Sequence, residues 1–290
     1  MPPTVRLRPM TSADVDPVSA AILADDWGDR RSWFEFAVGH PRCTVLCATD
    51  DDGTVIGTGV ATHNGPVAWI GTIWVAAVHR GAGLGRALTE AAIEAAEAAG
   101  ARSLLLVATS AGRPLYERLG FTEEARYVIL ERAGGASSDE VTEADATGHS
   151  TRIVRAYRPG DLPALATLDA VATGEDRAHL LTAFAAPGTT RVVVDASDRP
   201  TGFLVRPPWG GGATIAVDAD DALALLEARR RTTPPERHVR CGVVASNERA
   251  LERLTRDGWT EAWTTPRLLR GDPIDWHPAQ VYGQFNFALG

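Results

Sequence analysis

Lysine is absent from this chain of 290 residues, in which all 29 basic residues are arginine. Schiff-base chemistry, which needs a lysine amine, is therefore excluded. A Walker-type nucleotide loop is excluded as well, because its phosphate contact depends on a lysine.

The chain has little cysteine and no long apolar run. Its three cysteines, Cys43, Cys47 and Cys241, are an odd number with no histidine cluster beside them, so neither a disulfide framework nor a zinc or other metal site is expected. The formal net charge of −8 argues against a nucleic-acid partner. No apolar run reaches membrane-spanning length, and the first residues lack the apolar core of a signal peptide. We therefore expect a cytoplasmic protein without a membrane partner.

One segment combines a strand, a glycine-rich turn and the start of a helix. The apolar run Val67–Val75 is followed by Arg80-x-x-Gly83-x-Gly85 and then by the strong helix former Arg86–Ala99. The first N–H groups of a helix have no intrahelical partner, and glycines let an anion approach them closely. This context predicts a phosphate or pyrophosphate site. A glycine-rich turn without a ligand is the alternative interpretation.

The same turn resembles the pyrophosphate-binding motif of the GNAT acyltransferases. Downstream, the stretch 111–121 resembles the second signature of that family, a short helix that ends in Tyr116-x-x-x-Gly120-Phe121. The resemblance implies an α/β fold with an α+β mixed sheet and acetyl-CoA as the cofactor. It also implies that acetyl-CoA is held by Ile73, Trp74, Val75, Arg80, Gly81, Ala82, Gly83, Leu84, Gly85, Arg86, Thr109 and Tyr116.

The resemblance assigns two catalytic roles. The backbone N–H of Val75 would polarise the thioester carbonyl. The Tyr116 phenol, whose ordinary pKa is about 10, would protonate the leaving thiolate. A half-buried core tyrosine is the other interpretation of Tyr116. Many relatives carry Asn where this chain has Thr109, seven residues before the tyrosine.

The base that accepts the amine proton is not evident from the sequence. Many relatives carry a Glu on the strand that corresponds to Val67–Val75, but here Thr72 is the only polar side chain of that strand. We consider a water held by Thr72 and backbone carbonyls, and also Glu35 and His63. His63 precedes an Asn-Gly turn, so a solvated loop histidine is the favoured interpretation for it.

The second half of the chain faintly repeats the first. Arg8 and Asp14 are six residues apart at an expected strand-to-helix junction, and Arg155 and Asp161 repeat this spacing. The stretch 247–259 likewise parallels 109–121. Two tandem GNAT-like acyl-CoA N-acyltransferase folds are the simplest account. The expected segments are a catalytic domain at 1–133, a polar linker at 134–150, and a degenerate domain at 151–290.

The two copies differ in their site residues. At the corresponding helix start the second copy has Asp220 and Asp221, which would repel a pyrophosphate. It also has Leu254 where the first copy has Tyr116. We therefore expect only the first copy to bind acetyl-CoA.

Acids alternate with aromatic residues in the stretch 24–36, which would suit a cationic amine with an apolar body. Trp27, Trp33 and Glu35 are candidate substrate contacts there, and an amphipathic helix that buries Trp33 is the equal alternative. Tyr282 is a further candidate, together with Trp276 and His277.

The leading hypothesis is an acetyl-CoA-dependent N-acetyltransferase that modifies the primary amine of a small molecule by direct attack in a ternary complex. Acetylation of protein lysines or N-termini is an alternative, and so is a non-catalytic CoA-binding sensor or scaffold. A homodimer is possible under each of these hypotheses.

Overall fold

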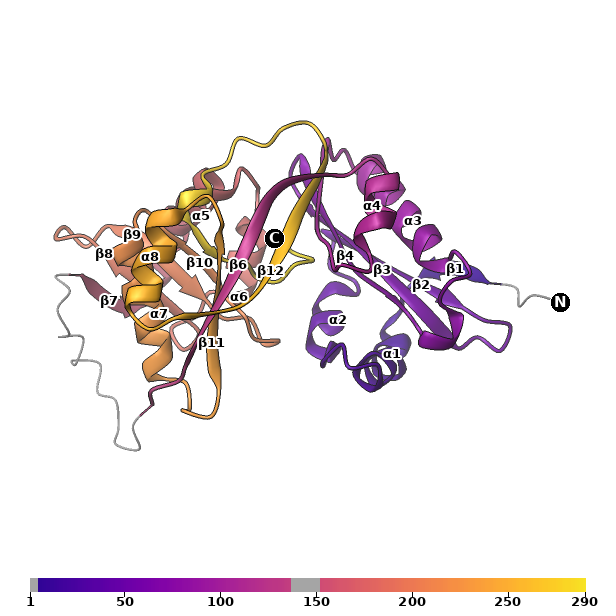
Figure 1. The fold of residues 1–290 in the computed structure, drawn as a ribbon, viewed down its shortest axis with the longest axis horizontal. Helices are drawn as coiled ribbons and strands as arrows, with labels where there is room; N and C mark the ends of the chain where they lie inside the picture. The colour runs from indigo at the N-terminus through magenta and orange to yellow at the C-terminus, as the bar shows by residue number, and fades with distance from the viewer. Residues whose placement is uncertain (1–4, 137–151) are drawn as a thin grey trace. The chain divides into compact units, whose positions relative to one another are not determined.

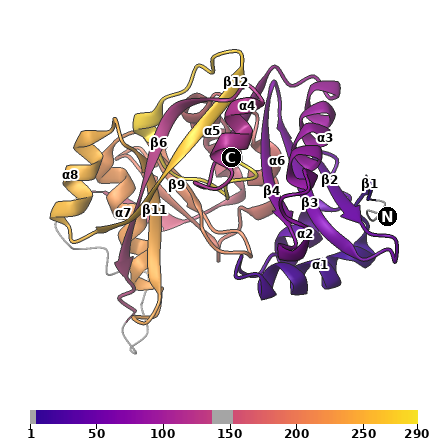
Figure 2. The ribbon, with the colours of Figure 1, turned by 45° about the vertical axis from the view of Figure 1, so that its right-hand side comes forward.

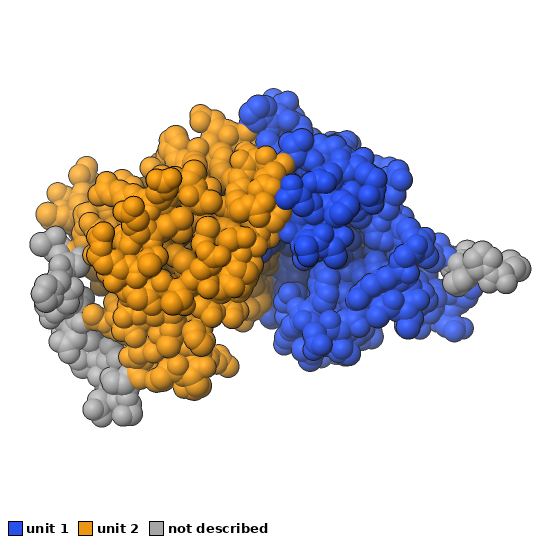
Figure 3. All heavy atoms as spheres, viewed as in Figure 1, with its two compact units in different colours: residues 1–122, 268–273, 287–290 blue, residues 123–267, 274–286 orange. Residues whose placement is uncertain are grey.

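The computed structural model describes residues 5–136 and 152–290 of the chain. These residues form two compact units, which Figure 3 shows in different colours. Neither unit is one contiguous stretch of chain. Unit 1 contains Met1–Thr122, Leu268–Pro273 and Phe287–Gly290, and unit 2 contains Glu123–Arg267 and Ile274–Asn286.

Unit 1 alternates strands and helices in the order expected from the sequence (Figure 1). Asp50–Gly53 lie in one turn between its antiparallel strands, as their composition predicts. The next turn is Gly65-Pro66, one residue later than expected, because Asn64 still belongs to a strand. Its elements are β1 (Arg6–Pro9), α1 (Ser12–Ala24), α2 (Arg31–Ala37), β2 (Cys43–Thr49), β3 (Val55–Asn64), β4 (Val67–Val75), η1 (Ala77–His79), α3 (Leu84–Ala98), β5 (Ser103–Val107) and α4 (Arg113–Arg118).

Strands β1 to β5 follow one another in sequence order across the sheet of unit 1. Helix α3 covers one face of this sheet and helices α1 and α2 cover the other (Figures 1 and 2). The α3 sequence explains its packing, because Leu84, Leu88, Ala92 and Ala96 recur every fourth residue and are all buried. This stripe holds the start of α3 close to the end of β4, where the glycine-rich turn lies.

Unit 2 contains most of the remaining elements, and the boundary between the units falls within β6 and β12. In the larger sheet β12 lies between β5 and β6, and β11 pairs with β6. The elements are β6 (Thr122–Ala133), β7 (Ile153–Ala156), η2 (Pro159–Asp161), α5 (Leu162–Thr173), α6 (Ala178–Phe184), β8 (Thr190–Val194), β9 (Pro200–Val205), β10 (Ala213–Ala216), α7 (Ala219–Arg231), β11 (His238–Val244), α8 (Glu248–Arg256), β12 (Thr260–Gly271), η3 (Pro278–Gln280) and β13 (Val281–Gly283).

A five-stranded sheet in unit 2 has the order β13-β10-β9-β8-β7. Its core is formed with α7 and α8, and includes Leu225, Leu226, Leu254 and Tyr282. The last of its strands in the sequence, β13, pairs antiparallel with β10. The edge of β10 that faces away from β9 is therefore paired with a later strand of the same unit.

The repeated arginine and aspartate form equivalent ion pairs in the two units. Arg8 donates through Nη1 and Nη2 to the Asp14 carboxylate at 2.8 Å each. Arg155 makes the same two bonds to Asp161, also at 2.8 Å. Each pair joins a strand, β1 or β7, to the helical turn that follows it, so the repeat inferred from the sequence is confirmed in three dimensions.

Two further expectations from the sequence concern the linker between the domains and the absence of a membrane-spanning segment. Most of the linker expected at 134–150 lies outside the described residues, so its extent stays a prediction. Within the described residues, no helix combines the length and the apolar character needed to cross a bilayer.

Candidate acetyl-CoA site

The glycine-rich turn of unit 1 leaves the start of α3 open to an anion. Gly83 is the residue before the helix, its φ is +84°, and no side chain caps the helix from there. The first intrahelical bond runs from Ala87 N–H to Gly83 O, so the preceding N–H groups have no partner within α3. A Cβ at Gly81 or Gly83 would meet no other atom within 4 Å. The turn thus combines unpaired donors with open space in front of them, which fits a pyrophosphate.

Strand β4 contains a bulge with a strained residue. Thr58 pairs with Trp74 and Val60 pairs with Gly71, so Thr72 and Ile73 together face a single residue of β3. Thr72 has φ +50°, which is an outlier for a β-branched side chain. Such a conformation costs about 1–3 kcal/mol and is found most often at functional sites.

Beyond this bulge, β4 separates from β5. Their parallel pairing covers only Val67–Trp69 and Ser103–Leu105, although β4 continues to Val75. The N–H of Ala76 bonds to Ile56 O of β3. Because successive N–H groups along a strand point to opposite edges, the N–H of Val75 points away from β3, toward the opened side. This is the direction that polarisation of a bound carbonyl requires.

Arg80 braces the turn rather than extending toward its open space. Its Nε donates to Val75 O at 2.8 Å, and its Nη2 donates to Asp25 Oδ2 at 2.7 Å. The same carboxylate oxygen accepts the indole N–H of Trp74 at 3.0 Å. Arg86, at the helix start, is exposed and pairs with Glu90. The backbone is therefore the better candidate for the phosphate contact, with both guanidinium groups already engaged by carboxylates.

Tyr116 lies on α4 with its ring against Phe121, at a centroid distance of 6.2 Å. Burial raises the pKa of its phenol to about 12. Its hydroxyl makes no hydrogen bond to any residue in the described part of the chain. A protonated phenol without an internal acceptor is available to give its proton to a ligand.

Thr109, seven positions before Tyr116, and Asn247, seven positions before Leu254, form the same kind of turn in the two copies. Thr109 Oγ1 accepts the N–H of Gly112 at 3.1 Å. In unit 2, Asn247 Oδ1 accepts the N–H of Ala250 in the corresponding place. Thr109 thus replaces the turn-forming role of an asparagine, and a contact from it to the cofactor stays a prediction.

The expectation that His63 is a solvated loop residue is wrong. Strand β3 continues to Asn64, so His63 belongs to the strand and is only 9% exposed. Burial is the main cause of its lowered pKa, and Arg42 adds to it. His63 pairs with Ala68, seven residues from Val75, which corresponds to about 23 Å along a strand. It lies too far away to take a proton at the opened end of β4.

The candidate substrate residues have contrasting environments. Trp27 is 37% exposed, and Glu35 is exposed beside Arg31. Trp33 is only 2% exposed, and its indole N–H donates to Thr72 Oγ1 at 3.1 Å. Tyr282 is 1% exposed within β13. The two buried side chains offer no surface to a substrate in this structure, so burial of Trp33, the alternative from the sequence, is favoured.

Two further candidates lie in unit 2. Trp276 stacks on the Arg267 guanidinium, with 3.9 Å between the guanidinium carbon and the ring centroid. His277 is exposed, and its backbone N–H donates to Ala172 O. Both are held by neighbours within unit 2, and no substrate role follows from these contacts.

Sequence reasoning missed the segment Phe287–Gly290, which belongs to unit 1. A Cβ at Gly71 would lie 2.5 Å from the Ala288 Cβ, so the glycine permits a close approach next to the bulge. Asn64 Nδ2 donates to Leu289 O at 2.7 Å. An isolated glycine in a strand does signal a bulge or a close neighbour, but it does not say which segment approaches.

The corresponding sites of the second copy are filled by the chain itself. The side chain of Asp218 caps α7 by accepting the N–H of Asp221 at 2.9 Å. Strand β13 pairs with β10, and Leu254, at the position of Tyr116, is 1% exposed. These features distinguish unit 2 from the uncapped α3 and the opened β4 of unit 1, and that only the first copy binds acetyl-CoA stays a prediction.

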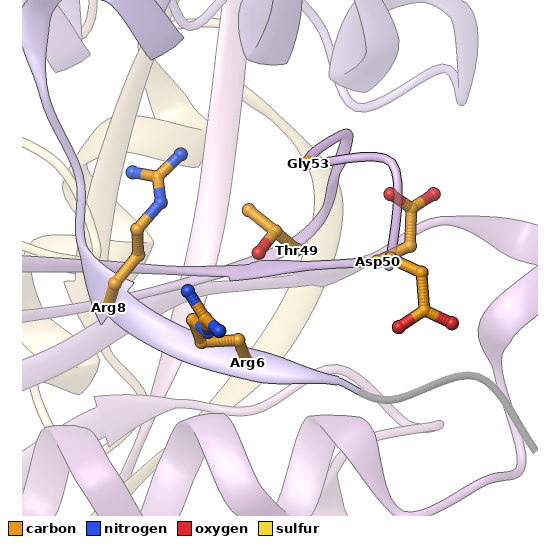
Figure 4. Close-up of a pocket in the computed structure, with 6 residues that line it drawn as sticks. Arg6, Arg8, Thr49, Asp50 and Gly53 are labelled. Carbon is orange, nitrogen blue, oxygen red and sulfur yellow. The ribbon is translucent and has the colours of Figure 1, made fainter.

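A hollow of about 280 Å³ lies elsewhere on unit 1, at the outer edge of the sheet (Figure 4). It is lined by Arg6, Arg8 and the turn after β2, and Arg8 is already paired with Asp14. The hollow is two strands away from β4, so it is separate from the site described above. Among the described residues, no group of three His, Cys, Asp or Glu side chains could hold a metal ion.

Comparison with known proteins agrees with this geometry. Residues 13–121 match the model of the acetyltransferase (GNAT) family, and residues 165–283 match the model of an acetyltransferase (GNAT) domain. The two matches together span well over half of the chain.

Solved structures resemble the chain over almost its whole length. A putative acetyltransferase from Pyrococcus horikoshii is 21% identical with a TM-score of 0.78, covering 99% of this chain and 96% of that one. A GCN5-related N-acetyltransferase from Sphaerobacter thermophilus is 18% identical with a TM-score of 0.60, covering 94% and 98%. A tandem GNAT protein from the clavulanic acid biosynthesis pathway is 14% identical with a TM-score of 0.61, covering 94% and 100%. With the sequence signatures, the family matches and this shared fold, the chain belongs to the GNAT family of N-acetyltransferases and carries two GNAT domains in tandem.

Proposed function

We propose that this protein transfers an acetyl group from acetyl-CoA to the primary amine of a small molecule, by direct attack with both substrates bound. Three features of unit 1 support the proposal. These are the uncapped start of α3, the opened edge of β4 and the Tyr116 hydroxyl. Together they supply an anion site, a carbonyl-polarising donor and an acid.

Each feature has a defined task in this reaction. The N–H groups from Gly83 to Arg86 would bind the pyrophosphate. Acetyl-CoA supplies the thioester. The Val75 N–H would donate to the thioester carbonyl as the amine nitrogen forms its bond to that carbon. Tyr116 would give its proton to the sulfur as the carbon–sulfur bond breaks.

The amine proton would leave through water at Thr72. His63 lies on β3 opposite Ala68, at the end of β4 far from Val75, so it is not placed to take the proton. Glu35 is exposed on α2 and stays an alternative candidate. A threonine hydroxyl is not itself a base, but it can hold a water between the amine and backbone carbonyls. We expect this path to serve amines that are partly neutral at the working pH.

We further propose that only the first GNAT domain holds acetyl-CoA and that the second is degenerate. Supporting this, Asp218 occupies the helix start that a pyrophosphate would need in unit 2. In addition, β13 occupies the edge of β10 that corresponds to the opened edge of β4.

Thiol release from acetyl-CoA over a panel of small amines tests the proposal, with Tyr116→Phe as the diagnostic variant. We expect kcat to fall about 100-fold or more, because a missing general acid typically costs 10²–10⁴-fold. The affinity for acetyl-CoA should change little, since the aromatic ring remains. Tyr157→Phe is the control, because Tyr157 is a buried tyrosine of unit 2, whereas Tyr116 is a partly buried tyrosine of unit 1.

Three outcomes would contradict the proposal. Binding of acetyl-CoA without turnover of any amine would favour a sensor or scaffold. Turnover of protein lysines or N-termini in place of the small amines would assign the other substrate class. Full activity in Tyr116→Phe would remove the tyrosine from the mechanism.

A further inference from the structure

Trp33 connects α2 to the strained residue of β4. Its indole ring is 2% exposed, and Nε1–H donates to Thr72 Oγ1 at 3.1 Å. This bond directs the polar group of Trp33 toward the strand that is proposed to bind the thioester. Trp33 is therefore a buried neighbour of the strained residue, bonded to its side chain.

Thr72 is held at two points. Trp33 binds its hydroxyl, and the buried Thr58 donates through Oγ1 to its carbonyl oxygen at 2.8 Å. Its φ of +50° lies in a region that β-branched residues rarely adopt. Such a conformation persists only where the surrounding structure determines it strongly, and these two bonds supply that determination.

The direction of the Val75 N–H depends on this bulge. N–H groups alternate between the two edges of a strand, so one inserted residue turns every later N–H to the opposite edge. Thr72 and Ile73 face one residue of β3, and this insertion precedes Val75 by only two residues. Without the bulge, the Val75 N–H would point toward β3 instead of toward the opened side.

We propose that Trp33 is a positioning residue for acetyl transfer, because its hydrogen bond to Thr72 holds the bulge that aims the Val75 N–H at the thioester. The inference rests on the proposed function of β4. It names a residue that does not touch a substrate and that acts through the backbone of Thr72.

The test is a double-mutant cycle of Trp33→Phe and Thr72→Gly. Phenylalanine removes the N–H but keeps an aromatic ring, while glycine adopts positive φ without steric strain. In the wild-type background, Trp33→Phe should lower kcat about fivefold, the effect of losing one hydrogen bond, with KM for acetyl-CoA within about twofold. In the Thr72→Gly background, whatever its own activity, Trp33→Phe should have no further effect.

Trp209→Phe is the matched control. The Trp209 indole donates to Phe285 O at the same distance of 3.1 Å, but this bond lies in unit 2. We expect this variant to lose stability without losing kcat. Amide hydrogen exchange of a peptide covering residues 70–76 gives a readout that needs no ligand, and it should accelerate in Trp33→Phe but not in Trp209→Phe.

An equal fold loss of kcat in both backgrounds would show that Trp33 only fills space, and would overturn the inference. Unchanged kcat and unchanged exchange in Trp33→Phe would overturn it as well. If the wild-type protein neither binds nor turns over acetyl-CoA, the proposed function fails. The exchange measurement would still decide whether Trp33 holds the bulge, since unchanged exchange contradicts it.

Discussion

At the scale of single residues, burial raises the pKa of Tyr116 and extends the pH range in which its phenol is protonated. The raised pKa of about 12 keeps the phenol protonated two pH units beyond an unperturbed tyrosine. An acid must carry its proton; an unperturbed tyrosine does so at neutral pH, and the shift extends this condition to alkaline pH. The raised pKa also keeps the fraction of phenolate, the inactive form, small at the pH values at which most amines become neutral.

The first prediction concerns the alkaline side of the pH profile. Because only the protonated phenol is active, kcat should not fall through tyrosine ionisation below about pH 11, and should fall as pH approaches 12. Steady-state kcat measured from pH 7 to 10.5 checks this, with Tyr116→Phe measured alongside. A decline with an apparent pKa near 10 that disappears in the variant would contradict the burial argument.

At the scale of elements, the two ends of α3 offer a controlled comparison. Gly83 precedes the helix with φ +84° and Gly100 follows it with φ +93°, and a Cβ at either would meet no atom within 4 Å. Alanine at either position should destabilise the fold by about 1–2 kcal/mol, the cost of a left-handed L residue. The strain is therefore matched, while only Gly83 faces the proposed anion site.

The second prediction is that Gly83→Ala weakens acetyl-CoA binding about tenfold or more, because its methyl group enters the space in front of the free N–H groups. Gly100→Ala should lower the melting temperature by a similar amount and leave the dissociation constant unchanged. Calorimetric titration with acetyl-CoA and thermal unfolding separate the two effects. Equal affinity in both variants would place the pyrophosphate elsewhere.

The third prediction concerns the ion pair that joins β1 to α1. Arg8 holds the pKa of the Asp14 carboxyl well below its usual range, and Thr11 adds to this. A carboxyl whose pKa is lower in the folded state stabilises the fold above its unfolded pKa of about 3.9. That stabilisation is lost as pH falls through the folded-state value.

Asp14→Asn should therefore cost about 1–2 kcal/mol at pH 7, and the difference from wild type should shrink as pH falls below about 4. Asp16→Asn is the control on the same helix, because Asp16 is exposed and its pair with Arg31 should contribute little. Denaturant unfolding at pH 7 and at pH 3 measures both. A constant difference between wild type and Asp14→Asn across this range would refute the linkage.

At the scale of the whole molecule, two copies of one fold should bind one cofactor. The fourth prediction is a stoichiometry of one acetyl-CoA per chain in calorimetric titration. Glutamate at Gly83 should abolish this binding, because it places a carboxylate where the pyrophosphate would lie. One equivalent of acetyl-CoA that still binds to the Gly83→Glu variant, together with two equivalents in the wild type, would show that the second domain is also a CoA site.

The sequence predicted the elements of unit 1 closely because their signals are local. The strand Val67–Val75 was expected with the bounds that the structure shows, and the helix after it begins two residues earlier than expected. The paired turns and the repeated arginine and aspartate are local signals too. Each of these signals depends on only a few neighbouring residues.

What the sequence could not show depends on contacts distant along the chain. No periodicity indicates that Phe287–Gly290 joins unit 1, or that β12 lies between β5 and β6. The bond from Trp33 to Thr72 spans 39 positions, and it explains a tryptophan that composition alone could equally assign to the substrate. The bulge was also unforeseen, because Gly71 signals either a bulge or a close neighbour without deciding between them, and a threonine with positive φ leaves no signal of its own.

The separation of β4 from β5 leaves the backbone of Ile70–Val75 as an edge inside a sheet, and proteins normally pair or cover such edges. In the proposed complex, the amide-bearing arm of acetyl-CoA completes the sheet as a detachable strand. We therefore expect resistance to unfolding and to proteolysis to follow the supply of the cofactor, by about 2.7 kcal/mol at a hundredfold excess over its dissociation constant. Starvation for acetyl-CoA would then reduce not only the rate of this protein but also the amount of it that survives.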